Sequence, residues 1–598
     1  MPGMNSGLSP SDPTLVAAFR SALLHQGAIA LLMLVFLWLL WATARTWRPA
    51  VSAGTSGVTA GEPAEARARW LLRTGFGVLW IFDGILQAQP KMAGGLATQV
   101  MEPIAASSPG WVQHLVNWGG TAWSYHPVQA GAASVWIQVG IGTWLIVAVR
   151  GPWSRLAGAA SVIWGLIVWV FGESFGGIFA PGLSWLTGAP GAVLIYVVAG
   201  ALIALPGGAW RTPRPGRLLL AGLGVFFAAM AVLQAWPGRG FWPGRAAAKP
   251  GTLSRMVTEM AGTPQPHFLS SLLSGFASFA TRYGFAVNLV VVIALAAMGA
   301  AFLSGRPRLV RYAMWSGIVF CLADWVLVQD LGFLGGLGTD PNSMIPLIVL
   351  FSAGYLALTP AAQEAEAPAR AAEAKRPGVR SVAAAGALAV ILLGAAPMAA
   401  AAVNRTADPI LALAISGDST SLNLPAPGFS LTDQNGRTVS LAGLRGKVVL
   451  MTFLDPVCTS DCPIIAQEFK QTGQMLGAQA KNVELVAVVA NPTYRSTAFT
   501  RAFDRQEGLT AVPDWLYLTG SLSQLGAVWR HYGVTVENLP AGAMAAHNDL
   551  AVVIDPAGRI RQELSSDPGP ATSSTRSSFS VLLGQYARQA LRQTPGQS

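Results

Sequence analysis

Two of the chain's three cysteines, Cys458 and Cys462, are separated by three residues and directly follow the apolar run 447–454. This spacing allows the two thiols either to close a disulfide or to converge on one metal ion. A structural disulfide, a redox pair and a metal clamp are therefore the three interpretations. A disulfide across so short a loop would stabilise the fold only slightly, which favours redox or metal chemistry.

A third group bears on the choice between redox and metal chemistry. Two thiolates are soft donors that prefer Cu(I), and an added imidazole would let the same site hold Cu(II). The best candidate is His547, which follows a Gly- and Ala-rich stretch and directly precedes a predicted hairpin at 550–564. From the residues alone, Cys458, Cys462 and His547 are candidates for a metal site, and a surface or packing role for the histidine stays open.

The elements that must position these residues form an α/β pattern after residue 425. Continuous apolar runs predict two buried central strands, helical spacing predicts four helices, and the Asp555–Gly558 turn predicts a final hairpin. This order predicts a thioredoxin-like fold, with Cys458 in the loop after the first central strand and Cys462 in the first turn of a helix. There the helix dipole should lower the thiol pKa. The strands are expected at 447–454 and 483–490, the helices at 463–476, 496–506, 521–533 and 579–593, and a polar tether at 404–425.

Three stretches carry a family resemblance: "PGFSLTDQNGRTVSLAGLRGKVVLMTFLDPVCTSDCP", "WLYLTGSLSQLGAVWRHYGV" and "AAHNDLAVVIDPAGRIR". Together they resemble the Sco/SenC family of copper-handling, thioredoxin-fold proteins over roughly residues 425–595. The resemblance implies that Cys458, Cys462 and His547 bind copper as Cu(I) or Cu(II). It also implies two kinds of partner, which are a respiratory oxidase subunit or other copper acceptor and a thiol reductant. Two positions depart from the family pattern: the pair reads Cys-Thr-Ser-Asp-Cys-Pro, and Asn491 stands where aspartate is common.

The sequence therefore favours a membrane-anchored copper metallochaperone that delivers copper during assembly of cytochrome c oxidase. The alternative is an extracytoplasmic thiol-disulfide oxidoreductase, in which Cys458 and Cys462 are the catalytic pair and a membrane redox module, which could be quinone-linked, supplies electrons. Thioredoxin-like enzymes usually carry a CxxC pair, and the longer spacing together with His547 favours copper. A peroxiredoxin is disfavoured because Asp455 stands where its proline is expected.

The rest of the chain has the composition of a membrane protein, with 52% hydrophobic and 11% charged residues. We expect a polytopic α-helical membrane domain in which each of ten nearly uncharged windows forms a transmembrane helix. These windows lie at 28–44, 70–90, 126–149, 156–172, 191–206, 218–237, 285–305, 309–330, 344–359 and 381–403.

Lys and Arg are concentrated in alternate loops, which predicts the orientation of these helices. The bias places both termini outside the cytoplasm, so the domain after residue 404 is expected to be extracytoplasmic in a bacterial-type, multi-pass plasma membrane protein. The net charge of +11 reports this topology. The basic residues form no single stripe, so we expect membrane lipid and no nucleic acid as a partner.

An internal repeat organises the helical part. "ILQAQP" (85–90) recurs as "VLQAWP" (232–237), and "WVFGESFGGIFAPG" (169–182) is answered by "WVLVQDLGFLGGLG" (325–338). The pattern predicts a parallel four-plus-four repeat and resembles a duplicated DoxX-like four-helix unit. The expected domains are residues 1–66 with the first helix, 67–210 and 211–360 as the two repeats, 361–424 as loop, last helix and tether, and 425–598 as the Sco/SenC-like domain.

Ionisable residues at membrane depth are functional hypotheses by default, and Asp83 and Asp324 are the two that position explains least. Others are expected at outer mouths or in loops, where they could contact protons, quinones or metals, or could simply cap helices and meet water. This second group comprises His114, His126, Glu173, His267 and Asp330. The remaining cysteine, Cys321, lies in an apolar window and is expected to be a packing residue.

Overall fold

The structure is a computed structural model that describes residues 13–46, 65–106, 108–180, 184–242, 251–263, 265–334, 337–358, 377–403, 419–459, 461–538, 544–565 and 579–592. The chain divides into two compact units. One consists of residues 24–89 and 133–396 and is called the helical unit below. The other combines the C-terminal domain with residues 90–132 and the chain's start, so the 90–132 segment separates from the first predicted repeat.

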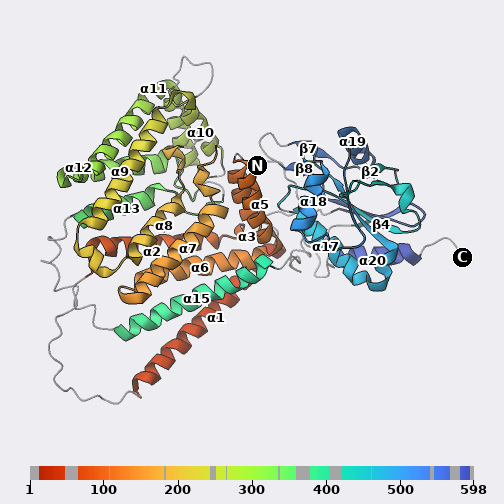
Figure 1. The fold of residues 1–598 in the computed structure, drawn as a ribbon, viewed down its shortest axis with the longest axis horizontal. Helices are drawn as coiled ribbons and strands as arrows, with labels where there is room; N and C mark the ends of the chain where they lie inside the picture. The colour runs from red at the N-terminus through yellow and green to blue at the C-terminus, as the bar shows by residue number, and fades with distance from the viewer. Residues whose placement is uncertain are drawn as a thin grey trace. The chain divides into compact units, whose positions relative to one another are not determined.

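All ten windows expected to span the membrane are helices in the structure (Figure 1). Seven of the described helices are long and apolar enough to cross a membrane: α1 (Pro13–Thr46), α6 (Pro127–Val147), α7 (Gly151–Phe171), α9 (Arg214–Ala235), α11 (His267–Ser304), α12 (Pro307–Leu327) and α15 (Pro377–Val403). The other three expected helices do not meet this standard. α8 (Ala192–Ala204) and α13 (Met344–Leu358) are too short, and α2 (Arg67–Gln87) carries four charged side chains. Several apolar helices therefore indicate membrane association, while ten crossings remain a prediction.

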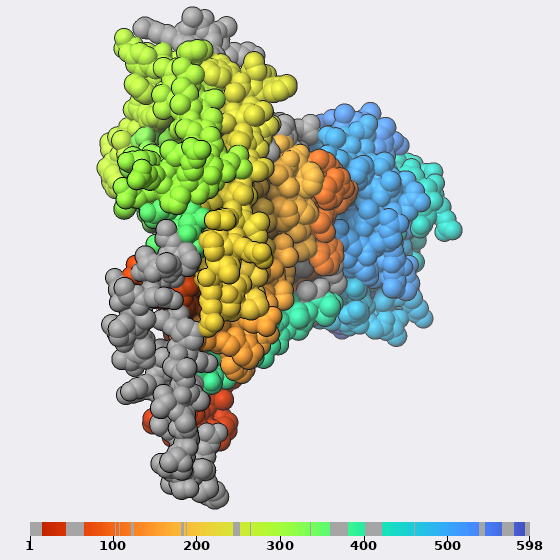
Figure 2. Space-filling model, turned by 60° about the vertical axis from the view of Figure 1, so that its left-hand side comes forward, coloured from red at the N-terminus to blue at the C-terminus, as the bar shows by residue number. Residues whose placement is uncertain are grey.

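The outward faces of α9, α11 and α12 are apolar. On α9, the exposed side chains Leu218, Val225 and Val232 lie seven residues apart, which places them on one side of the helix. Figure 2 shows the surface of these helices in yellow to green. Equivalent exposed groups on the other two helices are Phe285, Val290, Ile293, Tyr312, Trp315 and Val319. Such a surface suits contact with lipid acyl chains.

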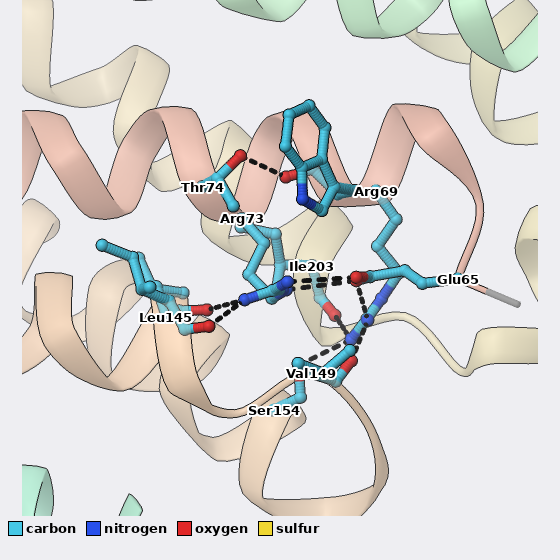
Figure 3. Close-up of polar contacts among 10 residues, drawn as sticks. Glu65, Arg69, Arg73, Thr74, Leu145, Val149, Ser154 and Ile203 are labelled. Carbon is cyan, nitrogen blue, oxygen red and sulfur yellow. Dashed lines mark hydrogen bonds and ion pairs between the residues drawn. The ribbon is translucent and has the colours of Figure 1, made fainter. Parts of the chain in front are cut away.

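Two buried arginines tie helix ends together at the start of α2 (Figure 3). The guanidinium of Arg73 donates to both carboxylate oxygens of Glu65 at 3.1 Å and to the Leu145 carbonyl at 2.8 Å. Arg69 donates to Glu65 at 2.8 Å, to the Val149 carbonyl at 2.7 Å, to the Ser154 hydroxyl at 2.7 Å and to the Ile203 carbonyl at 3.3 Å. The unpaired carbonyls at the ends of α6 and α8 are thereby satisfied.

The turns that follow α7 and α12 have the same local geometry. The indole of Trp169 donates to the Pro190 carbonyl at 2.8 Å, and that of Trp325 donates to the Pro341 carbonyl at 2.8 Å. The first turn contains four consecutive residues with positive φ, Ser174–Gly177, and the second contains three at the matching positions, Asp330–Gly332. This correspondence supports the proposed duplication locally, and the complete four-plus-four repeat stays a prediction.

The C-terminal domain is the predicted α/β, thioredoxin-like fold. Its six-stranded sheet has the order β1-β10-β9-β4-β5-β6, in which β4, β5 and β6 are parallel and β9, β10 and β1 are antiparallel. The strands are β1 (Ser419–Pro425), β4 (Val448–Leu454), β5 (Val483–Val489), β6 (Trp515–Leu518), β9 (Leu550–Ile554) and β10 (Arg559–Ser565). The helices are α17 (Asp461–Leu476), α18 (Thr497–Gln506), α19 (Leu522–His531) and α20 (Phe579–Arg592). Every residue of β4 and β5 is buried, as their continuous apolar runs require.

Two small two-stranded sheets accompany the main sheet: β2 (Ser430–Thr432) with β3 (Thr438–Ser440), and β7 (Val536–Asn538) with β8 (Ala545–His547). The tether expected at 404–425 is wrong at its end, because 419–425 form β1 and pair with β10. The polar composition of this stretch hid an edge strand, one face of which meets solvent. Residues 404–418 lie outside the described residues.

Candidate metal site

The two cysteines occupy the predicted places between β4 and α17. Cys458 lies in the loop after β4, where its amide donates to the Asp455 carbonyl at 3.1 Å. Cys462 is the second residue of α17 and is followed by Pro463, which is well tolerated in a first helical turn. Neither cysteine is in a disulfide, and both are buried, with 7% and 1% of their surfaces exposed.

His547 lies at the same end of the main sheet, three residues before β9, which pairs antiparallel with β4. It is the last residue of β8, where it pairs with Val536 of β7. Its Nε2 atom lies 3.4 Å from the Cys462 sulfur. Its Nδ1 atom lies 3.3 Å from the Asn548 carbonyl and 3.8 Å from an Asp549 carboxylate oxygen. Both neighbours of Nδ1 are acceptors, so we assign the proton to Nδ1 and the free lone pair to Nε2, facing the sulfur.

Burial sets the charge state of these groups. It lowers the pKa of His547 to about 4, against the opposing effect of the Asn548 carbonyl, so the imidazole is neutral at pH 7. Burial, followed by the neighbouring Cys458, raises the pKa of the Cys462 thiol well above its usual value. The expectation that the helix N-terminus lowers this pKa is therefore wrong, because desolvation of the fully enclosed sulfur outweighs the helix dipole.

Asp455 holds the three segments of the site together. Its amide donates to the Cys462 sulfur at 3.3 Å, and its Oδ1 accepts from the Val457 amide at 3.0 Å. Its Oδ2 accepts from the Asn491 side chain at 2.9 Å and from the Ala545 amide, at the start of β8, at 2.7 Å. Burial, and then the neighbouring Cys458, raise the pKa of Asp455 to about 7. One carboxyl thus links the cysteine loop to the strand that carries His547.

The motif spacing pointed to neither Asp455 nor Met544. The Thr459 hydroxyl lies 3.9 Å from the Met544 sulfur, which places a thioether beside the cysteine loop. The sequence did contain one signal for Asp455, which is its position directly after a buried strand. Residues in that position lie at the carboxyl end of the sheet, where the loops after neighbouring parallel strands come together. Asn491, which departs from the family pattern, follows β5 at the same end and donates to Asp455.

The structure therefore brings Cys462 and His547 into contact and places Cys458 beside Cys462. Two sulfurs and a neutral imidazole are a donor set that fits copper. Within the described ranges, no three His, Cys, Asp or Glu side chains are already arranged as a closed metal-binding group.

The other candidate residues lie in the helices and turns that precede the C-terminal domain. Asp83 and Asp324 are buried, at 2% and 5% exposure, and so is Cys321. His114 and His267 are exposed, and His126, directly after the helix α5 (Gly110–Tyr125), is buried. Within the part of the chain that the structure describes, none of these residues joins a metal-binding group.

The fold and the site define an α/β, thioredoxin-like domain that carries a CxxxC pair and a histidine at the end of its sheet. Residues 418–576 match the family model SCO1/SenC. The resemblance inferred from the cysteine motif is thereby confirmed for this domain. The match covers the C-terminal part of the chain, and the DoxX-like resemblance of the helical part stays a prediction.

The chain is similar to solved structures of several Sco proteins. Bradyrhizobium japonicum ScoI with copper bound is 21% identical, with a TM-score of 0.23, and the match covers 28% of this chain and 98% of that chain. Yeast Sco1 with copper bound is 16% identical, with a TM-score of 0.24 and coverage of 29% and 96%. A SCO1/SenC family lipoprotein from Bacillus anthracis is 19% identical, with a TM-score of 0.25 and coverage of 29% and 98%. No curated protein matches the chain.

Proposed function

We propose that this chain is a membrane-anchored copper metallochaperone whose C-terminal domain binds copper through Cys458, Cys462 and His547. The observation that carries the proposal is the 3.4 Å contact between the Cys462 sulfur and the His547 Nε2 atom. The Nδ1 atom of the same ring is directed at the Asn548 carbonyl, which leaves Nε2 as the donor on the sulfur side. The family match of residues 418–576 and the copper-bound relatives agree with this choice of cargo.

The acceptor we propose is a subunit of respiratory cytochrome c oxidase during its assembly. Copper would pass by ligand exchange, in which the acceptor's donors replace the sulfurs and the imidazole one at a time. This exchange requires reduced Cys458 and Cys462, so a thiol reductant belongs to the cycle. The apolar helices would anchor the protein in a bacterial-type plasma membrane, with the C-terminal domain on the extracytoplasmic side.

A thiol-disulfide oxidoreductase is the second candidate, and the adjacency of Cys458 and Cys462 favours it. Such an enzyme needs an accessible thiolate to attack a substrate disulfide. Cys462 is 1% exposed, and its burial disfavours the thiolate in the absence of a metal. The enclosed sulfur beside an imidazole therefore fits a metal ligand better than an attacking nucleophile.

The test is Cu(I) titration of the purified full chain in detergent, against a competing chelator and under reducing conditions. We expect one tightly bound Cu(I) per chain. The variants Cys458→Ser, Cys462→Ser and His547→Ala should each weaken binding by about 100-fold, which corresponds to about 2.7 kcal/mol. The matched control is Cys321→Ser, which removes the third cysteine, in α12, and should leave the affinity unchanged.

Two results would contradict this assignment. Undiminished copper affinity in both cysteine variants would show that Cys458 and Cys462 are not copper ligands. The oxidoreductase would replace the chaperone if the wild-type chain bound no copper and instead reduced a disulfide substrate with loss of activity in either cysteine variant.

A further inference from the structure

The helix α11 is longer than one membrane crossing requires. Its 38 residues extend for about 57 Å, whereas a hydrocarbon core is about 30 Å thick. The backbone leaves helical geometry at Tyr283, where φ is −120° and ψ is 27°. The helix therefore consists of two halves, residues 267–282 and residues 284–304.

The end of the neighbouring helix α9 marks where the two halves meet. Near that end, the Gln234 side chain donates to the Asn288 side chain at 2.8 Å. The second half of α11 therefore runs beside α9, and the first half continues past it. Trp236, which directly follows α9, is exposed, and the ring centroid of Trp242 lies 5.3 Å from that of Phe285. Tryptophans are typical of the level of the lipid headgroups, so this is the level expected for the membrane surface.

The first half of α11 has three different sides. One side is buried, and the helix α10 (Thr252–Ala261) packs against it (Figure 1), where the Ser254 hydroxyl donates to the Ala277 carbonyl at 3.2 Å. A second side is polar and exposed, with Ser271, Ser274 and Ser278. The third side, called the aromatic row below, consists of Phe268, Leu272, Phe276, Phe279 and Tyr283. Residues three or four apart share one side of a helix, so these side chains form a continuous line.

The aromatic row is exposed in spite of the size of its side chains. Between 44% and 68% of the surface is exposed in four of its members, which are Phe268, Leu272, Phe279 and Tyr283. The ring centroids of Phe276 and Phe279 are 6.5 Å apart, and those of Phe279 and Tyr283 are 5.0 Å apart. The rings thus form one contiguous apolar patch, and its removal from water is favourable.

The outward surface of α10 is polar, in contrast to the aromatic row. Leu253 and Val257 are buried, and the exposed side chains are those of Arg255, Thr258 and Glu259. The pair formed by α10 and the first half of α11 therefore presents one apolar line between polar sides. This pattern is typical of helices that lie in a membrane interface.

We propose that the aromatic row inserts into the boundary between the headgroups and the acyl chains of a phospholipid bilayer. Two observations favour lipid over a protein partner. The row continues into the second half of α11, where Phe285, Val290 and Ile293 belong to the apolar surface that suits acyl chains. The guanidinium of Arg282 lies 5.4 Å from the centroid of the Tyr283 ring, which places a cation beside the row for the lipid phosphates.

The break at Tyr283 provides the turn that this placement needs. A helix that crosses the bilayer can continue there along its surface, with the serines and α10 directed to water and the aromatic row to lipid. The inference rests on the membrane association of the apolar helices and is independent of the copper proposal.

The experiment reads the surroundings of single side chains in the full chain, reconstituted into phosphatidylcholine nanodiscs. A bimane fluorophore is attached at Leu272→Cys or Phe279→Cys, in the aromatic row, or at Ser274→Cys, on the polar side of the same half-helix. The three native cysteines are replaced by serine in this background. Lipids that carry a nitroxide near the start of the acyl chain quench a fluorophore at that depth. We expect quenching at positions 272 and 279 to be at least about twofold stronger than at position 274.

Val290→Cys, in the second half of α11, reports whether the chain is inserted in the bilayer. Size-exclusion profiles select the variants that fold. Strong quenching at position 290 with equal signals at positions 272, 274 and 279 would overturn the proposal and leave the membrane anchor intact, because the row would then face water or protein. Lack of quenching at all four positions would overturn membrane insertion and the proposal together.

Discussion

In the C-terminal domain the buried carboxyl of Asp455 accepts three hydrogen bonds, two from backbone amides and one from Asn491. In the helical unit the buried carboxyl of Asp324, on α12, accepts none from the described residues. The difference follows from the backbone. Loops at the end of a sheet have free amides to offer, whereas every amide inside a helix is already bonded within that helix.

A carboxyl group that is buried among helices must therefore be paired with a side chain, bonded to the free amides at a helix start, or protonated. Glu65 finds two guanidiniums, Glu173 finds an amide at the start of α8, and Asp324 finds no hydrogen-bonding partner among the described residues. In the C-terminal domain, Asp455 instead accepts hydrogen bonds from the segments around the cysteines. A buried carboxyl group therefore has backbone amides as partners in the loops and lacks them inside the helices. Substitutions can test this difference in each region.

The largest effect should come from Glu65→Gln, which removes the charge shared by Arg69 and Arg73. Two buried guanidiniums then keep only carbonyl and hydroxyl partners. Breaking a buried pair in this way costs about 3–5 kcal/mol. Denaturation of the full chain by titration with SDS, followed by circular dichroism of its helices, should show that loss.

The control for this substitution is Glu259→Gln, at an exposed position of the helix α10 (Thr252–Ala261). It should change the stability of the helices by less than about 0.5 kcal/mol. Equal losses in the two variants would show that the arginine cluster does not hold the helix ends together.

The next largest effect should come from Asp455→Asn. The new amide group would face the Ala545 amide or the Asn491 side chain, so two donors would oppose each other. A hydrogen bond lost in this way costs about 1–3 kcal/mol. Since β8 carries His547, Cu(I) affinity should fall about 10- to 100-fold in a chelator competition.

Asp433→Asn is the matched control, because Asp433 is equally buried and accepts from the amides of Asn435 and Arg437 in a turn between β2 and β3. It should lower stability without lowering copper affinity. Equal copper affinities in the Asp455 and Asp433 variants would show that the Asp455 contacts do not position the site.

The sequence alone was sufficient for the four helices of the C-terminal domain, for the strands β4 and β5, for the final hairpin and for the positions of the cysteines between them. Apolar runs and helical spacing carry that information, and the strands β4 and β5 begin and end within a residue or so of their predicted bounds. Edge strand β1 was not recognisable, because a half-exposed strand has a mixed composition that also suits a tether.

Side-chain environments were less accessible than elements. The thiol pKa of Cys462 was expected to fall because its helix position is visible in the sequence, while the burial that raises it depends on packing. Asp455, Asn491 and Ala545 come from three separate segments, so nothing in their spacing announces that one carboxyl joins them. Similarly, Asp83 was visible as a charge in an apolar window, whereas its neighbours Glu173 and Asp340 required the fold.

Glu507 is an exception in the C-terminal domain, because its buried carboxyl group resembles that of Asp324 and not that of Asp455. It is fully buried, and neither of its side-chain oxygens has a partner among the described residues, so burial raises its pKa to about 8. The folded state therefore binds more protons than the unfolded state between about pH 4.5 and 8. By linkage, stability falls as the pH rises through this window.

Glu507→Gln should remove that part of the pH dependence. Hydrogen exchange of the peptides that cover α18 and β6, corrected for intrinsic rates, measures the local opening free energy. The variant and the wild type should match at pH 4 and diverge as the pH rises to 9, with the variant exchanging at least about tenfold more slowly. A constant difference at all pH values would mean that Glu507 does not titrate in the folded domain.

Asp324→Asn should have the smallest effect and completes the comparison, because the same chemical change is made as in Asp455→Asn. Asp324 has no hydrogen bonds to lose among the described residues, and the amide occupies nearly the same volume. The SDS midpoint of the helices should therefore move by less than about 0.5 kcal/mol. A loss above about 2 kcal/mol would show that the carboxyl is paired in the native protein. In that case Asp324 would have a hydrogen-bond partner inside the helical unit. The contrast between loops, whose amides are free to donate, and helices, whose amides are already bonded, would then not hold.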